Sequence, residues 1–461
     1  MVAETLSETL QFELSAETLN QIETWLEEKN LDSVVEFVRE LHASDFADLI
    51  EKIDHTQRAE LIRTARQFFT PEVFEYLSYA LQETVARELD PKAVAQILSE
   101  LDSDDALNII AELEEKTRQR IMHELSATTR AEIEEGLAFP ENSAGRLMQR
   151  EVVAVPQFWT VGKTLDYLRA ASGDELPEDY YAVFAIDALQ RVSGRVPISR
   201  LLSTLRSVRL LDIMDQNVQR IPATMDQEEV AFLFRRYALV STPVVDADER
   251  LLGVITVDDV VEVIDEEASE DILKLASVGG ETTDATSGVW ITAWHRFGWL
   301  FINLLTAIFA SRVISLFSGS IEKTVALAAL APIVASMGGN TGTQTLAVAV
   351  RALATKELTM ANAARVVFKE AIVGGINGAF FAVLLGMIAG WIYNDIALGI
   401  VIGLAMIINL ISAGFLGAMI PIALTRFRFD PAVGSSVVLT TFTDCIGFFV
   451  FLGLASLFVV K

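Results

Sequence analysis

The chain has 461 residues, of which 51% are hydrophobic, and it carries a formal net charge of −27 at pH 7. This length predicts several domains, and the acidic balance excludes nucleic acid and anionic lipid surfaces as main partners. The charge is unevenly divided: the residues after 289 hold six acids and ten Lys or Arg, which leaves 57 of the 63 acids and 26 of the 36 bases for residues 1–289. Such an acidic front is typical of a solvated surface and equally of a domain that binds cations.

The first residues, MVAETLSETL, lack the apolar segment of a cleaved signal peptide. Cys445 is the only cysteine, so we expect no intrachain disulfide, which is typical of a cytosolic front. The four histidines lie far apart and show no zinc-ligand spacing. We find no nucleophile–base set and no Walker-type loop, and we therefore expect a protein that is not an enzyme.

Residues 1–140 are rich in Glu, Leu and Ala at helical spacing. A weak repeat is visible, because the apolar positions of residues 41–54 recur after 48 residues and again after a further 12. Short helices of one pattern predict an all-α superhelical domain. Asp102, Asp104 and Asp105 stand at one of its turns, where N-capping is the simpler interpretation and metal binding the alternative.

Residues 141–265 alternate between predicted strands and predicted helices. We expect strands at 152–155, 218–223, 244–245 and 252–255, and helices at 160–172, 226–237 and 257–264. The segment resembles a tandem pair of CBS modules. In that family the positions of Thr256 and Asp259 hold a ribose or phosphate, which implies a weak nucleotide site, with ATP as the candidate, in the second module. Pro197 and Arg200 occupy these positions in the first module, which argues against a nucleotide there.

Residues 257–271 hold eight carboxylates with no Lys or Arg among them. Helical spacing places Asp259, Glu262 and Glu266 along one face, which Glu270 continues. Like charges four residues apart destabilise a helix by roughly 0.2–0.5 kcal/mol per pair, and a divalent cation is the simplest counterion. A solvated linker helix is the alternative interpretation. Because this helix leads into apolar segments, we expect a connecting helix over 266–295.

The remaining residues, 296–461, are expected to form a transmembrane domain. Its five apolar segments lie near 297–317, 324–350, 366–393, 395–424 and 432–460. Positive charge gathers around 351–365 and 425–431, which places these loops and the N-terminus in the cytoplasm and the C-terminus outside. The second segment contains GGNTGTQT over 338–345, and so many amides and hydroxyls are not explained by helix packing alone.

Asp444 lies in the middle of the last apolar segment. A carboxylate at the centre of a bilayer costs about 2.5–3.5 kcal/mol, so we expect its side chain to face away from lipid. Ser436, Thr440 and Asp444 are four residues apart and share one helix face. This polar stripe predicts a path for cations, and a carboxyl held neutral between helices is the alternative.

Three motifs complete the pattern: GGNTGTQ at 338–344, Asp-Pro-Ala-x-x-Ser from Asp430, and TTFTD at 440–444. Together with the order of the helical domain, the CBS-like pair, the acidic helix and the apolar segments, these motifs make the chain resemble the MgtE family of magnesium channels over essentially its whole length. The resemblance implies a multidomain membrane protein with an all-α superhelical N-domain, an α/β tandem CBS pair, a long connecting helix and a five-helix transmembrane domain. It also implies a homodimer in the plasma (inner) membrane and a Mg²⁺-selective channel for magnesium uptake that closes when cytosolic Mg²⁺ is high.

The resemblance also assigns individual residues. Asp444 matches the pore aspartate. From the polar stripe and the GGNTG segment, and not from the resemblance, we expect Asn340, Gly339, Thr440 and Ser436 to line the pore with it. The positions that hold regulatory Mg²⁺ are matched by Asp259, Glu262, Glu267, Glu270, Asp271, Glu228 and Asp104. The chain departs from the family pattern at four positions, which are Asn108, Ala238, Ser436 and Val437.

Two rival functions stay open from the sequence. One is a CBS-regulated secondary transporter that moves divalent cations by coupling to Na⁺ or H⁺, and its flux would follow that gradient. The other is a nucleotide or metal sensor anchored in the membrane, which would carry no ion flux.

Overall fold

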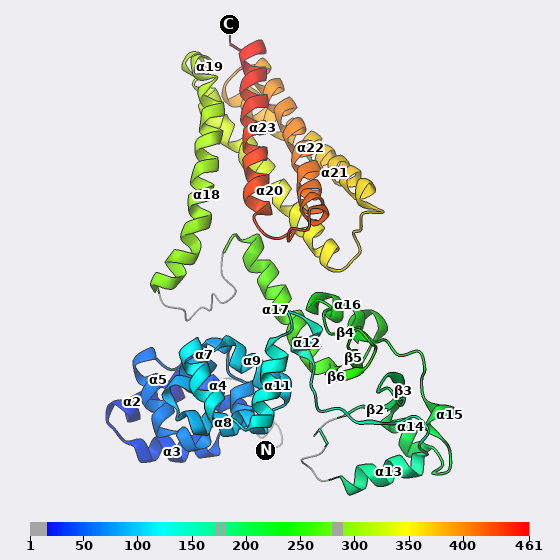
Figure 1. Ribbon diagram of the computed structural model, residues 1–461. Helices are drawn as coiled ribbons and strands as arrows, with labels where there is room; N and C mark the ends of the chain where they lie inside the picture. Colours follow the sequence, from blue (N-terminus) through cyan, green and yellow to red (C-terminus); the bar gives the residue numbers. More distant parts are fainter. Residues whose placement is uncertain (1–15, 172–175, 178–179, 279–288, 461) are drawn as a thin grey trace, which may run out of the picture. The chain divides into compact units, whose positions relative to one another are not determined.

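The computed structural model describes residues 16–171, 176–177, 180–278 and 289–460. The chain divides into two compact units, residues 1–264 and 265–461, and their elements are labelled in Figure 1. Among the described residues, strands occur only in the first unit, and the second unit is helical.

Short helices of one pattern fill the first third of the chain, as predicted. α4, α8 and α9 begin at Ala43, Pro91 and Ser103, which are 48 and then 12 residues apart, so the sequence repeat is a repeat of helices. Equivalent side chains point into one apolar core, since Ile50, Leu98 and Ile110 are all fully or almost fully buried. The helices are α2 (Ala16–Glu27), α3 (Leu31–Glu40), α4 (Ala43–Lys52), α5 (His55–Thr64), α6 (Pro71–Glu75), α7 (Tyr79–Glu88), α8 (Pro91–Glu100), α9 (Ser103–Glu112), α10 (Glu115–Glu124) and α11 (Ala127–Leu137), with a 3₁₀ turn at Arg66–Phe68.

Two similar α/β modules follow, each with a three-stranded sheet. In each sheet the first strand pairs parallel with the second, and the second pairs antiparallel with the third. The first module contains α12 (Ala144–Leu147), β1 (Ala154–Pro156), α13 (Val161–Ala170), β2 (Ala182–Ile186), β3 (Val192–Pro197), α14 (Ile198–Ser203) and α15 (Leu210–Ile213). The second contains β4 (Ile221–Pro222), α16 (Gln227–Tyr237), β5 (Ser241–Val245), β6 (Leu251–Thr256) and the start of α17. The paired pattern predicted from sequence is therefore present, although the strand expected at 218–223 shrinks to two residues.

Helix α17 runs over Val257–Leu275 and ends because Ser277 adopts a left-handed backbone with φ of 55°. The expectation of one connecting helix over 266–295 is therefore wrong among the described residues. α17 supplies 266–275, the next helix begins at Val289, and residues 279–288 of that call lie outside the described residues.

In the second unit, the described residues after α17 form five long helices and the short α19 (Ser318–Lys323). The long helices are α18 (Val289–Ser315), α20 (Ala326–Ala354), α21 (Ala363–Ile392), α22 (Ile396–Arg426) and α23 (Ser435–Phe458). Among the described residues, α18, α21, α22 and α23 are long and apolar enough to cross a membrane. α20 has 29 residues, or about 44 Å at 1.5 Å per residue, but its polar 338–345 stretch lowers its apolar character. Its crossing of the membrane stays a prediction.

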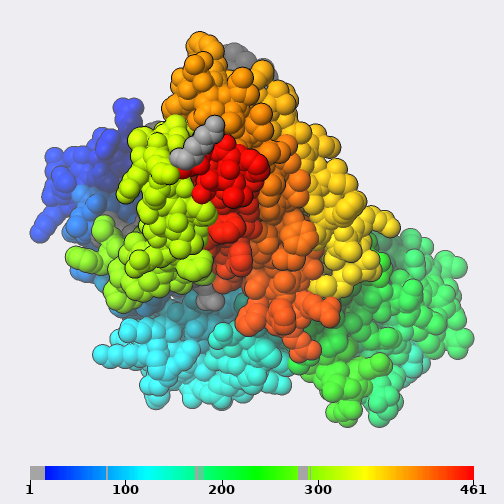
Figure 2. All heavy atoms as spheres, turned by 90° about the horizontal axis from the view of Figure 1, so that it is seen from above, coloured from blue at the N-terminus to red at the C-terminus, as the bar shows by residue number. Residues whose placement is uncertain are grey.

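α22 is the central helix of this unit, since it packs against α20, α21 and α23. Ile402, Met406 and Leu410 on α22 are buried together with Phe451 and Leu452 of α23. Figure 2 shows α23 in red between α18 and α22. The last helix also packs against α20, so α18, α20 and α22 all contact it.

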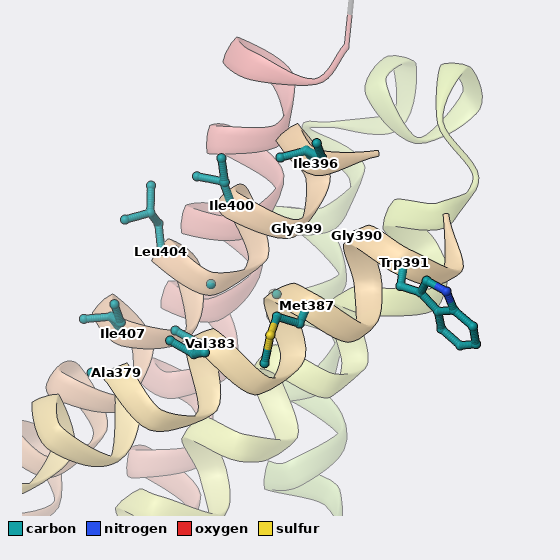
Figure 3. Close-up of a pocket in the computed structure, with 13 residues that line it drawn as sticks. Ala379, Val383, Met387, Gly390, Trp391, Ile396, Gly399, Ile400, Leu404 and Ile407 are labelled. Atoms are coloured by element: carbon teal, nitrogen blue, oxygen red, sulfur yellow. The ribbon is translucent and has the colours of Figure 1, made fainter. Parts of the chain in front are cut away.

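α21 and α22 approach closely where glycines face each other. A Cβ at Gly399 would lie 2.5 Å from the carbonyl oxygen of Gly386, so a larger side chain would force the two backbones apart. Beside this contact lies an apolar groove of about 650 Å³, flanked by Val383 and Met387 on α21 and by Ile400 on α22 (Figure 3).

The turn that leads into α23 depends on a glycine. Gly434 has a φ of +68°, a conformation that side chains with a Cβ rarely adopt, and a Cβ there would meet the Trp299 ring at 3.0 Å. The first turn of α23 follows immediately at Ser435. This turn therefore fixes where the helix starts and which way its faces point.

Candidate cation path and cation-sensing cluster

The predicted polar stripe of α23 lies on one helix, as expected. Asp444 is the tenth residue of α23, about 14 Å from its first residue, and α23 is long and apolar enough to cross a membrane. Thr440 is exposed, whereas Ser436 and Asp444 are half-buried, so the stripe lies at the surface of the single chain. Thr440 Oγ1 donates to the Ser436 carbonyl at 2.8 Å, and within the described residues no hydrogen bond is found for Asp444. If α23 crosses a membrane, a carboxylate without a partner there would be costly to leave facing hydrocarbon.

α20 brings the predicted GGNTG residues to the same depth. Gly342 packs against Leu439, and Gly338 and Gly447 both pack against Asn409, so residue 340 lies level with the segment around Asp444. Asn340 is exposed, and a Cβ at Gly339 would meet nothing within 4 Å. The two glycines Gly338 and Gly342 serve close packing, and the helix is not unwound there. α20 and α23 therefore present polar and open positions side by side.

Asn409 is a residue that sequence reasoning did not single out. It is fully buried on α22, and its Nδ2 donates to the Val334 carbonyl of α20 at 2.8 Å. Its Oδ1 has no hydrogen-bond partner. The side chain fills the space left by Gly338 and Gly447, so it joins three helices just behind the GGN segment. The signal in the sequence was a single amide within an otherwise apolar helix.

A second polar centre lies in the first unit, where the start of α9 meets the start of α17. We call it the α9–α17 cluster; its members are Asp102, Asp104, Asp105, Asp259 and Glu262. Ser103 fastens α9, because its Oγ donates to Glu151 Oε2 at 2.7 Å and accepts from the Arg150 backbone N at 2.8 Å. The capping interpretation of these acids is wrong for the side chains: Asp102 occupies the N-cap position without a capping hydrogen bond, and Asp104 is buried.

The carboxylates of the α9–α17 cluster perturb one another strongly. Burial raises the pKa of Asp104 well above its usual range, and the charges of Asp259, Asp105 and Asp102 add to the rise. Burial together with the charges of Glu75 and Asp259 raises the pKa of Asp105 to about 7. Burial raises the pKa of Asp259 to about 6 despite a hydrogen bond from Thr256 that lowers it. Burial also raises the pKa of Glu262. The site is thus short of positive charge.

The residues of this cluster have the oxygen atoms that a divalent cation needs, but they are not arranged around a common metal position. Asp104 Oδ1 is buried without a hydrogen-bond partner, and oxygen is the ligand that Mg²⁺ prefers. Over the described ranges, however, no three acidic, His or Cys side chains are arranged to hold a metal ion. A cation would have to draw these carboxylates together against their repulsion.

Glu267, Glu270 and Asp271 form a separate group at the end of α17. Lys274 pairs with Glu270 at 2.6 Å and with Asp430 at 2.8 Å. Burial and the charge of Asp430 raise the pKa of Asp271 to about 6. Asp430 was not among the predicted site residues, since only the fold brings it to α17. Glu228 lies in the first turn of α16, where its backbone N donates to Asp226.

The nucleotide candidates occupy a narrow cleft. Thr256 Oγ1 donates to Asp259 Oδ2 at 2.7 Å, so the two side chains bind each other. The cleft beside Thr256, between the two modules, offers about 10 Å³, roughly the room of one water. In the first module Arg200 donates to the Ile213 carbonyl, which is a structural contact. The α21–α22 groove of Figure 3 is lined by apolar side chains and glycines, so it does not suit a cation.

Comparison with known proteins gives matches along most of the chain. Residues 331–454 match a family described as a divalent cation transporter, residues 41–142 match the MgtE intracellular N domain, and residues 210–266 match the CBS domain. The magnesium transporter MgtE of Bacillus subtilis (strain 168) is 32% identical over 70% of this chain and 70% of its own length. The magnesium transporter MgtE of Thermus thermophilus is 35% identical over 71% of this chain and 72% of its own length. A solved structure described as the cytosolic domain of the Mg²⁺ channel MgtE in complex with ATP is 30% identical, covers 53% of this chain and 99% of that chain, and has a TM-score of 0.48.

Proposed function

The chain belongs to the MgtE family of magnesium transporters, and on that premise we propose that it is a Mg²⁺-selective channel for magnesium uptake that closes when cytosolic Mg²⁺ binds to it. The family is one of transporters and not of enzymes, in agreement with the sequence analysis. The transported ion is the substrate of the path on α20 and α23, and the regulatory ions belong to the acidic faces of α9 and α17.

The observation that carries the proposal is the unpaired Asp444 on an uncovered helix face. Asn340, Thr440 and Asp444 lie at the surface of one chain at a depth where lipid would otherwise meet them. Polar groups that face hydrocarbon are costly, so we infer that a second copy covers this face and that the stripe lines a path between the two copies. This supports the homodimer.

The chemistry of Mg²⁺ explains why one carboxylate per chain is enough. Mg²⁺ holds its water shell tightly and prefers six oxygens, so a path does not need to supply all six. Two Asp444 carboxylates would act on a largely hydrated ion, with Thr440, Asn340 and the backbone near Gly339 as further oxygens. Binding is then strong enough to admit the ion and weak enough to release it.

Gating follows from the repulsion inside the acidic groups. Without Mg²⁺ the carboxylates of the α9–α17 cluster oppose close packing. Mg²⁺ relieves this repulsion only in a conformation that brings the carboxylates together, so it shifts the population toward that conformation. The residues in this role are Asp104, Glu228, Asp259, Glu262, Glu267, Glu270 and Asp271.

The orientation is proposed from positive charge. Six basic residues lie in or beside the loop that connects α20 to α21 and the loop that connects α22 to α23. They are Arg351, Lys356, Arg365, Lys369, Arg426 and Arg428. Cytosolic loops are enriched in Lys and Arg, so we place these loops and the N-terminus in the cytoplasm and the C-terminus outside the plasma (inner) membrane. Nucleotide binding at Thr256 and Asp259 stays a prediction, and it would need the cleft between the modules to open.

The test is Mg²⁺ flux into liposomes that contain the full-length protein. Wild type should carry Mg²⁺ without a Na⁺ or H⁺ gradient, and Asp444→Ala should reduce the flux to that of empty liposomes. Asp395→Asn is a matched control, because Asp395 is an acid of the same unit that only caps α22 through the backbone of Ala397 and Leu398, a bond that Asn also accepts. Flux that follows a Na⁺ or H⁺ gradient would replace the channel by a coupled transporter, and normal flux in Asp444→Ala would refute the path.

A further inference from the structure

The last turn of α17 carries one lysine among carboxylates of two separate segments. Lys274 Nζ lies 2.6 Å from Glu270 Oε1, one turn earlier on the same helix, and 2.8 Å from Asp430 Oδ2, just before α23. Its side chain is 27% exposed. At this exposure a hydrogen-bonded charge pair is only partly screened by solvent. The lysine therefore links α17 to the loop that starts the last helix.

Asp430 is held at both oxygens. Its Oδ1 accepts the Ala432 backbone N at 2.8 Å, while Oδ2 accepts Lys274. The first bond shapes the turn that continues through Gly434 to Ser435. Movement of Lys274 would therefore pull directly on the turn that positions α23.

Two neighbours of Lys274 reach the same place. Leu275 packs against the apolar cluster that includes Ala432 and Leu439, and Ser277 Oγ lies 2.9 Å from Ser436 Oγ. Ser436 is the first residue of the polar stripe that ends at Asp444. We call Lys274, Leu275 and Ser277 the α17 latch, because together they fasten the end of α17 to the beginning of the proposed path.

Charge explains why a lysine is needed in the latch. Glu267, Glu270, Asp271 and Asp430 all act on this site. Burial opposes the charge of Lys274, but hydrogen bonds from its ammonium to Asp430 and Glu270 outweigh burial and raise its pKa above the usual range. Lys274 stays charged at every physiological pH, whereas a bound Mg²⁺ comes and goes with concentration.

We propose that Lys274 is a positioning residue, a built-in cation that holds the end of α17 to the loop before α23 when no divalent ion is bound. The inference rests on the proposed function in one respect, that α17 controls the path lined by α23. The protein supplies the first positive charge of this contact itself, and Mg²⁺ on the acidic faces of α17 strengthens a contact that already exists. Lys274 thereby sets how much Mg²⁺ is needed to close the path.

The experiment measures the latch without measuring flux. Ser277→Cys and Ser436→Cys are introduced into full-length protein that carries Cys445→Ala, so the only thiols are the two at the latch. Their hydroxyls lie 2.9 Å apart, which is close enough for a disulfide after small adjustments. The rate of cross-linking by a mild oxidant is compared in chelator and in excess Mg²⁺ for three proteins. They are the parent, which keeps Lys274, the Lys274→Met variant and the charge-preserving control Lys274→Arg.

In chelator, Lys274→Met should cross-link about tenfold more slowly than the parent, since a hydrogen-bonded, partly shielded charge pair is lost. Lys274→Arg should stay within about twofold of the parent, and excess Mg²⁺ should return Lys274→Met to near the parent rate. A Lys274→Met rate equal to the parent in chelator, or one that stays slow in excess Mg²⁺ while Lys274→Arg is normal, would overturn the inference.

A double-mutant cycle tells the ion pair apart from a general loss of structure. Asp430→Asn keeps an oxygen for the Ala432 N–H but removes the charge. If the two residues act through one contact, adding Asp430→Asn to Lys274→Met should slow cross-linking less than the two single effects combined; simple additivity would argue against the pair. If wild type carries no Mg²⁺ in liposomes, the proposed function fails while the cross-linking result still stands by itself.

Discussion

The carboxylate of Asp444 and the carboxylates of the α9–α17 cluster both lie in surroundings that disfavour a negative charge, but for different reasons. Asp444 is one acid, half-buried, with hydrocarbon as the alternative neighbour. Asp104 is a buried acid whose neighbours are other acids. Under the proposed function, a cation would meet one carboxylate per chain at Asp444 and several in the α9–α17 cluster. On that proposal, the number of carboxylates would distinguish a site that an ion leaves quickly from a site where it stays long enough to be sensed.

The sharpest way to break this comparison is to neutralise one acid of each kind. Asp444→Asn should lower Mg²⁺ flux at least about 100-fold, because the path loses its charge, and it should leave Mg²⁺-dependent protease protection of residues 257–278 unchanged. Asp104→Asn should do the reverse, with flux retained at low Mg²⁺ and protection weakened. Flux in liposomes and proteolysis of the same preparations check both. Equal effects of both variants on flux would show that the two sites do not have separate roles.

The acid–acid repulsion predicts an unusual pH dependence of stability in metal-free buffer. The pKa of Asp105 is about 7 and that of Asp259 about 6 in the folded protein, against about 3.9 in an unfolded chain. The folded state therefore keeps protons that the unfolded state has released, so the stabilising contribution is complete below about pH 4 and is lost as the pH rises through 6 to 7. We expect the first unit to lose on the order of a few kcal/mol between pH 5 and 7.5.

Urea unfolding of the full chain in detergent measures this loss through the fluorescence of Trp25 and Trp159, with the other tryptophans replaced. Asp105→Asn should flatten the pH dependence, and Mg²⁺ at pH 7.5 should restore most of the lost stability. A first unit that is more stable at pH 7.5 than at pH 5 without metal would contradict the assigned repulsion.

The stability of the second unit should depend on side-chain packing, whereas that of the α9–α17 cluster depends on charge. Gly338→Ala places a methyl group against the Asn409 amide, and overpacking of this kind costs typically about 1–3 kcal/mol. The adjacent Gly339→Ala is the matched control, because a Cβ there meets nothing within 4 Å. Thermal unfolding of both variants in detergent should show a lower midpoint for Gly338→Ala only, and equal midpoints would mean that Asn409 moves aside.

The smallest effect is expected for an exposed ion pair. Arg206 Nη2 lies 2.6 and 2.7 Å from the two Asp166 oxygens, but the side chains are 54% and 63% exposed. Arg206→Ala should cost less than about 1 kcal/mol and should not change the response to Mg²⁺. A loss comparable to the pH effect above, measured by the same urea unfolding, would mean that exposed pairs carry more of the stability than the buried cluster.

Local sequence patterns were predictable because the spacing of residues along a helix does not depend on what packs against it. The spacing of Ser436, Thr440 and Asp444 fixes one helix face whatever packs against it, and the 12-residue repeat returned as α8 and α9. Contacts between distant segments were not predictable in this way. The Ser-Asp-Asp sequence at 103–105 is typical of a helix start, so only the fold shows that Asp104 is buried.

The end of α17 and the role of Asp430 were missed for a related reason. Ser277 itself has no strong signature in composition, but the Gly279–Gly280 pair that follows it in the sequence is a helix-stop signal that the expectation of a helix to 295 passed over. Asp430 was noted only as part of a motif, and its pairing with Lys274 depends on how α17 meets the loop before α23. Asn409 likewise has meaning only beside Gly338 and Gly447.

Gly434 restricts which mutations this chain tolerates. It has a left-handed backbone directly before α23, and a Cβ there would meet the Trp299 ring at 3.0 Å, so a substitution would strain the turn ten residues before Asp444. Under the proposed function, we therefore expect a substitution at Gly434 to impair ion passage from a position that does not itself contact the ion.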